Sequence, residues 1–260
     1  MNNQTLNEII KRDLDACYFS ITMIKSSIYF SFGNDYITKR NVITFVGCNI
    51  NGVRKYISSV FEDEFNKTSA WYDLFLLWKK KNLNDIFYFV ITDNKYIKDA
   101  INLAFPDCTC LKSCFNSIDK ISNFFSNSYI NDSTAKLAKI YNSCDINQFN
   151  LNVSNFFEEV INLPFIKDIV KDDFKDFSSY FNMDFTLRKN IFSFYFFRDF
   201  RKSLIKLANK TEFSSINDFQ ILLINDIQRF EKRRYCPINE WNQILSILYR
   251  DRKDLISKYL

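Results

Sequence analysis

The sequence predicts an α/β protein built on a mixed five-stranded sheet flanked by helices. The first indication is the stretch 85–92, which is continuously apolar, β-branched and aromatic, as in strands buried on both faces at the centre of a sheet. The second is the change to helical spacing over 95–105, which Pro106 ends. The third is an alternation of short β-type runs and turn residues in the first sixty residues.

The first sixty residues predict an antiparallel meander of three strands. Asn51-Gly52 is a strong hairpin signal, and Gly33-Asn34-Asp35 predicts a second turn. The expected strands are 14–21, which 28–32 either continues or pairs with, 41–50 and 53–61.

The remaining core elements follow in a recognisable order. Ser69 is the expected N-cap of a helix that runs to Lys81, and 108–111 is a short fifth strand. Three antiparallel strands, a helix, a strand, a helix and a strand form the order of an RNase H-like fold. Further helices are expected at 118–125, 135–141, 153–163, 166–177, 187–208, 216–230 and 238–249. We therefore expect a core of 1–112 and 186–260, with a helical insertion at 113–185 before the last long helix.

The composition excludes several chemistries. With only three glycines among 260 residues, the chain has no Gly-rich nucleotide loop, and without histidine it has no Ser-His-Asp or Cys-His catalysis. Cys108-x-Cys110 and Cys114 superficially suggest a metal, but the chain lacks a second C-x-x-C pair, and the seven cysteines are expected to be reduced thiols. No apolar run reaches membrane-spanning length and the N-terminus is not a signal peptide, so we expect a cytoplasmic protein with no membrane partner.

The basic residues are clustered, although the net charge is only +5. The clusters are 79–81, then Arg198, Arg201, Lys202 and Lys206, then 232–234, and then Arg250, Arg252 and Lys253. Each cluster alone is explained by a solvated helix face. Together they make nucleic acid a serious candidate partner.

Asp93 ends the predicted central strand, just before a helix. Open α/β sheets bind their ligands at this edge, so Asp93 is a candidate site residue. The alternative is that Asp93 only caps the helix with its side-chain oxygen.

Taken together, these features resemble the Mutator-type transposases of bacterial insertion sequences, over nearly the whole chain. The similar segments are Leu14-Asp15-Ala16-Cys17-Tyr18; Thr92-Asp93-Asn94 with Ala100-Ile101, Phe105-Pro106 and Cys114; Arg188-Lys189-Asn190-Ile191-Phe192; and Tyr235-Cys236-Pro237-Ile238-Asn239-Glu240-Trp241-Asn242. The resemblance implies three carboxylates that hold two Mg²⁺ ions and cut and rejoin DNA by in-line phosphoryl displacement. It assigns Asp15 and Asp93 to the first two positions, as catalytic and metal-binding residues expected to meet at one edge of the sheet.

The third carboxylate is where the chain departs from the family pattern. The position of the catalytic Glu falls on Arg198, which cannot bind Mg²⁺. Asp199 is a possible substitute, although it is about 100° further around the helix, and Glu158 and Glu159 are others. Ser117 stands where a Cys-x-x-His motif would need histidine, and the DNA-binding region that precedes the first Asp in the family is expected to be absent.

These departures leave alternative functions open. Arg198 is expected either to neutralise Asp15, Asp93 or both, or to lie in solvent on a stripe with Lys202 and Lys206. The chain is then either a truncated or impaired transposase, which uses Mg²⁺ only if it is active, or a non-catalytic nucleic-acid-binding or self-associating protein. A third interpretation is a small α/β protein in which both aspartates are caps. DNA is the expected partner, a homodimer is possible, and the candidate DNA contacts are Arg201, Lys202, Lys206, Arg233 and Arg234.

Overall fold

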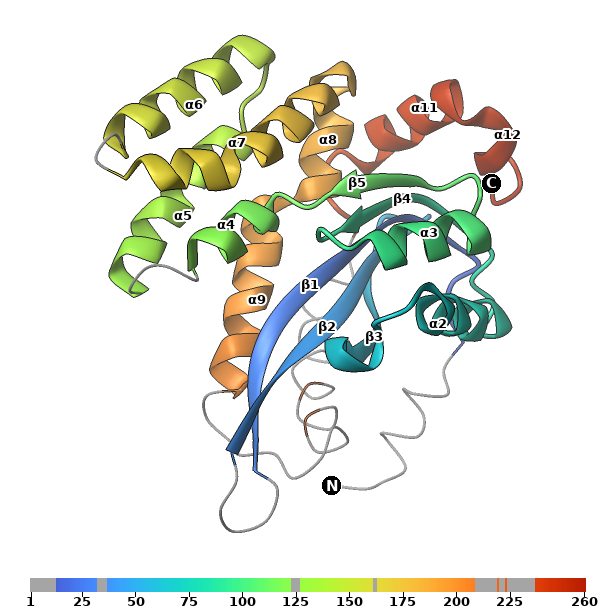
Figure 1. Cartoon of the computed structure of the whole chain (residues 1–260). Coiled ribbons are helices and arrows are strands. Elements are labelled where there is room, and N and C mark those ends of the chain that lie inside the picture. Colours follow the sequence, from blue (N-terminus) through green and yellow to red (C-terminus); the bar gives the residue numbers. More distant parts are fainter. Residues whose placement is uncertain are drawn as a thin grey trace.

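A computed structural model describes residues 13–31, 37–122, 127–160, 163–208 and 237–260, together with Phe219 and Leu223 (Figure 1). The sheet contains β1 (Cys17–Ser31), β2 (Ile37–Asn49), β3 (Arg54–Phe61), β4 (Asp85–Ile91) and β5 (Thr109–Lys112). Its strand order is β3-β2-β1-β4-β5. The first three strands are antiparallel, and β4 is parallel to both β1 and β5. This is the mixed RNase H-like sheet that the sequence predicts.

Strand β1 is continuous as far as Ser31, so the described part of the run 28–32 continues the first predicted strand rather than pairing with it. The predicted turn at 33–35 lies outside the described residues. The hairpin at Asn51-Gly52 is confirmed, because Gly52 has a φ of 76° and the Asn49 side chain accepts hydrogen bonds from the backbone N–H groups of Asn51 and Val53. Gly52 also packs under Trp241, so its missing side chain permits a close contact with the C-terminal part of the chain.

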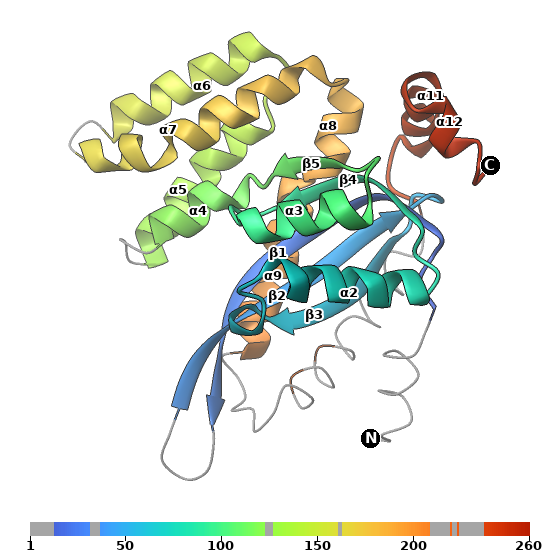
Figure 2. The same cartoon turned by 45° about the vertical axis from the view of Figure 1, so that its right-hand side comes forward.

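The two faces of the sheet are covered by different helices (Figure 2). Helices α2 (Thr68–Lys80) and α3 (Lys95–Ala104) pack on one face, where Trp71, Phe75 and Ile101 join Phe45 and Phe89 in one buried cluster. On the other face, α9 (Phe194–Ala208) and α11 (Trp241–Asp251) contribute to the larger cluster. Strand β4 is therefore buried on both sides, as its unbroken apolar sequence predicts.

The segment between β5 and α8 contains helices joined by short turns, and no strand among its described residues. It contains α4 (Phe115–Ser122), α5 (Asn127–Tyr141), α6 (Ile146–Glu159), α7 (Pro164–Ser178) and the 3₁₀ turn η2 (Ser179–Asn182). Helix α8 (Phe185–Phe192) follows, η1 (Glu62–Glu64) lies after β3, and α12 (Lys253–Ile256) lies near the C-terminus. The predicted helix at 216–230 falls outside the described residues, apart from two buried side chains. The division into a core and an insertion at 113–185 stays a prediction.

Three predictions about helix ends are wrong. Helix α2 has Lys67 at its N-cap position instead of Ser69, with no side-chain cap. Helix α3 is capped by Asn94, whose Oδ1 accepts from the backbone N–H groups of Tyr96 and Ile97, and not by Asp93. The predicted long helix 187–208 is two helices, because Ser193 between them adopts a left-handed conformation with φ 35°.

Candidate functional site

Asp15 and Asp93 lie at opposite ends of the same pair of strands. In the parallel ladder between β1 and β4, Cys17 pairs with Asp85 and Thr22 pairs with Val90. Asp15 therefore precedes the ladder, whereas Asp93 follows its carboxyl end. The seven residues of β4 lie between the two levels and by themselves span about 20 Å. The prediction that these carboxylates meet at one edge of the sheet is wrong.

Asp15 instead belongs to a local ion pair at the other edge. Its carboxylate accepts a hydrogen bond from Lys55 Nζ at 3.0 Å and another from Asn49 Nδ2 at 3.2 Å. Both partners come from the β2–β3 hairpin. Since Asp15 precedes a strand rather than a helix, it is not a helix cap either. Its position is explained by holding this hairpin to the start of β1.

The residue of β1 that comes level with Asp93 is a lysine. If the ladder is extended by three residues beyond Thr22 and Val90, Lys25 faces Asp93. Both residues line one pocket of about 550 Å³ at the carboxyl end of β4. Four basic and three acidic side chains line it: Lys25, Lys39, Lys120 and Arg201, with Glu62, Asp93 and Asp119. Sequence reasoning missed Lys25, although a charged residue in the apolar strand 17–31 was a visible signal.

Two ion pairs neutralise the acids on one side of this pocket. Lys25 Nζ lies 2.7 Å from a carboxylate oxygen of Glu62, which also accepts a hydrogen bond from Asn41 Nδ2 at 2.9 Å. Arg201 pairs with Asp119. Burial raises the pKa of the Asp119 carboxyl, and the charge of Arg201 opposes this effect.

Another lysine, Lys112, pairs with Asp93 and with two carboxylates of helix α7. The ammonium nitrogen of Lys112, at the end of β5, lies 3.4 Å from Asp93, 3.1 Å from Asp173 and 3.0 Å from Asp176. Burial disfavours the charge on Lys112, but the pairs with Asp176 and Asp173 outweigh burial, and the pKa of Lys112 is raised. Asp93 itself is the most exposed of the three acids. The side chain of Lys112 therefore links Asp93, at the end of β4, to two carboxylates of helix α7.

Asp173 is the buried centre of this network. Its side chain is 2% exposed and accepts hydrogen bonds from Lys120 Nζ at 2.8 Å and Ser117 Oγ at 3.0 Å. Ser117 also shares a hydrogen bond of 2.6 Å with the hydroxyl of Tyr141. The serine at the expected histidine position is therefore a structural hydrogen-bonding group. Nothing in the sequence pattern distinguished Asp173 from its exposed neighbours on the same helix.

Arg198 does not lie against the predicted acids. It pairs with the adjacent Asp199 at 2.7 Å, and its guanidinium lies 5.0 Å from the ring centre of Tyr195. The prediction that Arg198 neutralises Asp15 or Asp93 is wrong. The basic residue of α9 that lines the pocket is Arg201, three residues later.

The other proposed third carboxylates belong to different surroundings. Asp199 is exposed and paired with Arg198. Glu158 and Glu159 end helix α6, which packs on α5 and α7, and Glu159 pairs with Lys136 of α5. Within the described part of the chain, no group of three or more Cys, Asp or Glu side chains could hold a metal ion, and this includes Cys108, Cys110 and Cys114.

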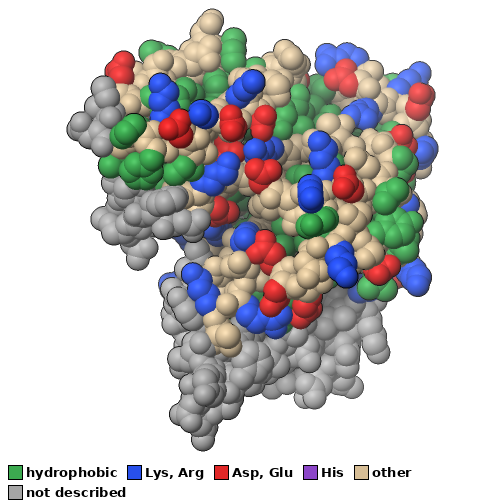
Figure 3. All heavy atoms as spheres, viewed as in Figure 1, with side chains coloured by type: hydrophobic (Ala, Val, Ile, Leu, Met, Phe, Trp, Pro, Cys, Tyr) green, Lys and Arg blue, Asp and Glu red, His purple; other side chains and the backbone are tan. Residues whose placement is uncertain are grey.

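The predicted DNA contacts are only partly described. Lys202 and Lys206 are exposed on α9, whereas Arg201 is partly buried in its ion pair. Arg233 and Arg234 lie outside the described residues. Figure 3 shows acidic and basic side chains interleaved along the crease between the helical segment and the sheet.

The strand order, with helices on both faces of the sheet, defines an RNase H-like protein. Residues 2–202 match the model of the family described as "Transposase, Mutator family". The chain therefore belongs to the Mutator family of transposases. No curated protein matches it. Among its described residues, no helix is long and apolar enough to cross a membrane.

The side chains at this edge do not fit the divalent metal that the family implies. Mg²⁺ requires oxygen ligands arranged around one point. Here Glu62, Asp93 and Asp119 are each paired with a lysine or an arginine. A metal ion would have to displace the side chains of Lys25, Lys112 and Arg201. Of these, Lys25 of β1 and Arg201 of α9 line the pocket itself.

Proposed function

We propose that this chain is a Mutator-family derivative that binds DNA without performing metal-dependent strand cleavage. The observation that supports this proposal is the set of internal ion pairs at the carboxyl edge of β4. Lys25, Lys112 and Arg201 supply fixed positive charge where a two-metal site would need free carboxylates. A cytoplasmic location and homodimer formation remain predictions from the sequence.

The DNA contacts that we propose lie on the exposed stripe of α9. Lys202 and Lys206 are four residues apart, so they lie on one side of the helix. Two lysines at this spacing can neutralise successive phosphates and so make binding depend on salt. Arg233 and Arg234 extend this proposal to residues outside the described structure.

The expected result is binding without cutting. Supercoiled plasmid incubated with the protein and Mg²⁺ or Mn²⁺ should show no metal-dependent nicking. Duplex DNA should bind, with an affinity that falls at least tenfold between 50 and 200 mM salt. The double substitution of Lys202 and Lys206 by alanine should reduce the slope of log affinity against log salt by about 2.

The matched control is the double substitution of Lys171 and Lys175 by alanine, since these exposed lysines have the same spacing on α7. This control should leave the slope unchanged. Nicking that requires Mn²⁺ and disappears in Asp93→Ala would contradict the proposal.

A rebuilt site provides a separate test. The double variant Lys25→Asp, Arg201→Glu adds two carboxylates to the pocket that Asp93 lines and removes two paired cations. Calorimetric titration with Mn²⁺ should then show a binding site that the natural chain lacks. Equal Mn²⁺ affinity in the natural chain and the double variant would show that the ion pairs do not exclude the metal.

A further inference from the structure

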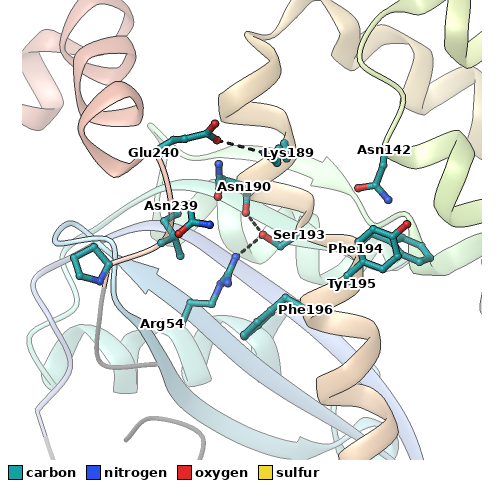
Figure 4. A pocket seen from close by; sticks show the side chains of 12 residues that line it. Arg54, Asn142, Lys189, Asn190, Ser193, Phe194, Tyr195, Phe196, Asn239 and Glu240 are labelled. Carbon is teal, nitrogen blue, oxygen red and sulfur yellow. Dashed lines mark hydrogen bonds and ion pairs between the residues drawn. The ribbon is translucent and has the colours of Figure 1, made fainter. Parts of the chain in front are cut away.

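A second pocket lies where helix α9 begins, away from the carboxyl edge of β4. Its volume is about 480 Å³, which is within the usual range for small-ligand sites. It exists because Ser193 interrupts the helix, so that α8 and α9 meet at an elbow. Strand β3 contributes Arg54, and the loop before α11 contributes Asn239 and Glu240 (Figure 4).

Two cations line this pocket. Arg54 donates a hydrogen bond to Ser193 Oγ and stacks on Phe196, with its guanidinium 3.8 Å from the ring centre. Lys189 is half exposed, and its pair with Glu240 is long, at 3.5 Å. Lys189 can therefore turn toward an incoming anion with little loss.

The remaining lining combines an aromatic ring with amides. Tyr195 is 52% exposed and lies on the opposite side of the opening from Arg54 and Asn239 in Figure 4. Asn142, Asn190 and Asn239 add three side-chain amides, which can both donate and accept hydrogen bonds. An exposed aromatic ring, side-chain amides and a pair of cations are groups that bind the face of a base, its polar edge and a phosphate, respectively.

We propose that this pocket holds one unpaired nucleotide of single-stranded DNA. Arg54 and Lys189 bind its phosphate, the base stacks on Tyr195, and the asparagine amides contact the polar edge of the base. A base inside a duplex is stacked on its neighbours, so it cannot enter. The inference rests on the proposed function, since it takes DNA as the polymer, but it uses different residues from the stripe on α9.

The test compares one labelled oligonucleotide as a single strand and as a duplex, by fluorescence anisotropy. Tyr195→Ala should weaken single-strand binding about tenfold, because loss of one stacking platform has effects of this size. Duplex binding should change less than about twofold. Tyr195→Phe keeps the ring and should keep the single-strand affinity. Tyr249→Ala, which removes a similarly exposed tyrosine on α11, should leave both affinities unchanged.

The phosphate contact has its own readout. Lys189→Gln should reduce the salt slope of single-strand binding by about 0.7. Lys171→Gln, at an equally exposed lysine, should not.

The possible outcomes separate the two proposals. If Tyr195→Ala binds both polymers as the natural chain does, or loses affinity for both equally, the nucleotide pocket is overturned while DNA binding stands. If the natural chain binds neither polymer, the proposed function fails, and this inference fails with it.

Discussion

Replacing Asp173 with alanine should lower the free energy of unfolding by about 3 kcal/mol. The carboxylate is 2% exposed and accepts from Lys112, Lys120 and Ser117. Without this carboxylate, Lys112 and Lys120 lose the partner that they share. Removing one partner of a buried ion pair is costly because the remaining charge is left uncompensated. Urea denaturation followed by circular dichroism measures the change.

The matched control is Asp168→Ala on the same helix. Asp168 is exposed, and among the described residues its ion pair is with Lys171, three residues away. Exposed pairs of this kind contribute about 0.5 kcal/mol or less. Equal losses in the two variants would mean that the buried contacts of Asp173 contribute no more to stability than an exposed ion pair does.

Replacing Arg188 with alanine should also lower the free energy of unfolding by about 3 kcal/mol, because hydrogen bonds donated by a buried charged group are strong. Arg188 is 3% exposed, and its Nη2 donates to the carbonyl oxygens of Ser143 and Cys144 at 3.0 Å each. Its guanidinium also lies 3.7 Å from the ring centre of Phe181. Burial lowers the pKa of Arg188.

Arg188→Lys should recover little of this loss, because an ammonium cannot reproduce the planar stacked contact and the two directed bonds together. The neighbouring Lys189→Ala is the control, since its half-exposed pair should contribute less than about 0.5 kcal/mol. If Arg188→Lys is as stable as the natural chain, the planar contact with Phe181 contributes nothing measurable.

The sheet was predictable because its signals are local. The Asn51-Gly52 turn, the apolar run of β4 and the switch to helical spacing each occupy a few adjacent residues. The break at Ser193 was not predictable in this way. The left-handed turn is held by Arg54, which lies 139 positions earlier in the chain and donates to the Ser193 hydroxyl. No window of sequence around 187–208 contains that partner.

The expectation that Asp15 and Asp93 meet was wrong for a related reason. The resemblance assigned the first carboxylate to Asp15. Whether Asp15 and Asp93 lie at the same end of their strands depends on how β4 is aligned along β1. A parallel pairing between distant strands leaves no trace in the sequence of either strand. Asp93 was correctly expected at the end of the central strand, whereas the placement of Lys25 and Lys112 beside Asp93 follows only from the register and the folded structure.

The amino group of Lys112 gathers three acids as a bound ion could, yet it is covalently part of the polypeptide. It cannot be stripped by a chelator or exchanged for another ion. The ion pairs between α7 and the sheet therefore form when the chain folds. Their contribution to stability does not depend on the magnesium concentration.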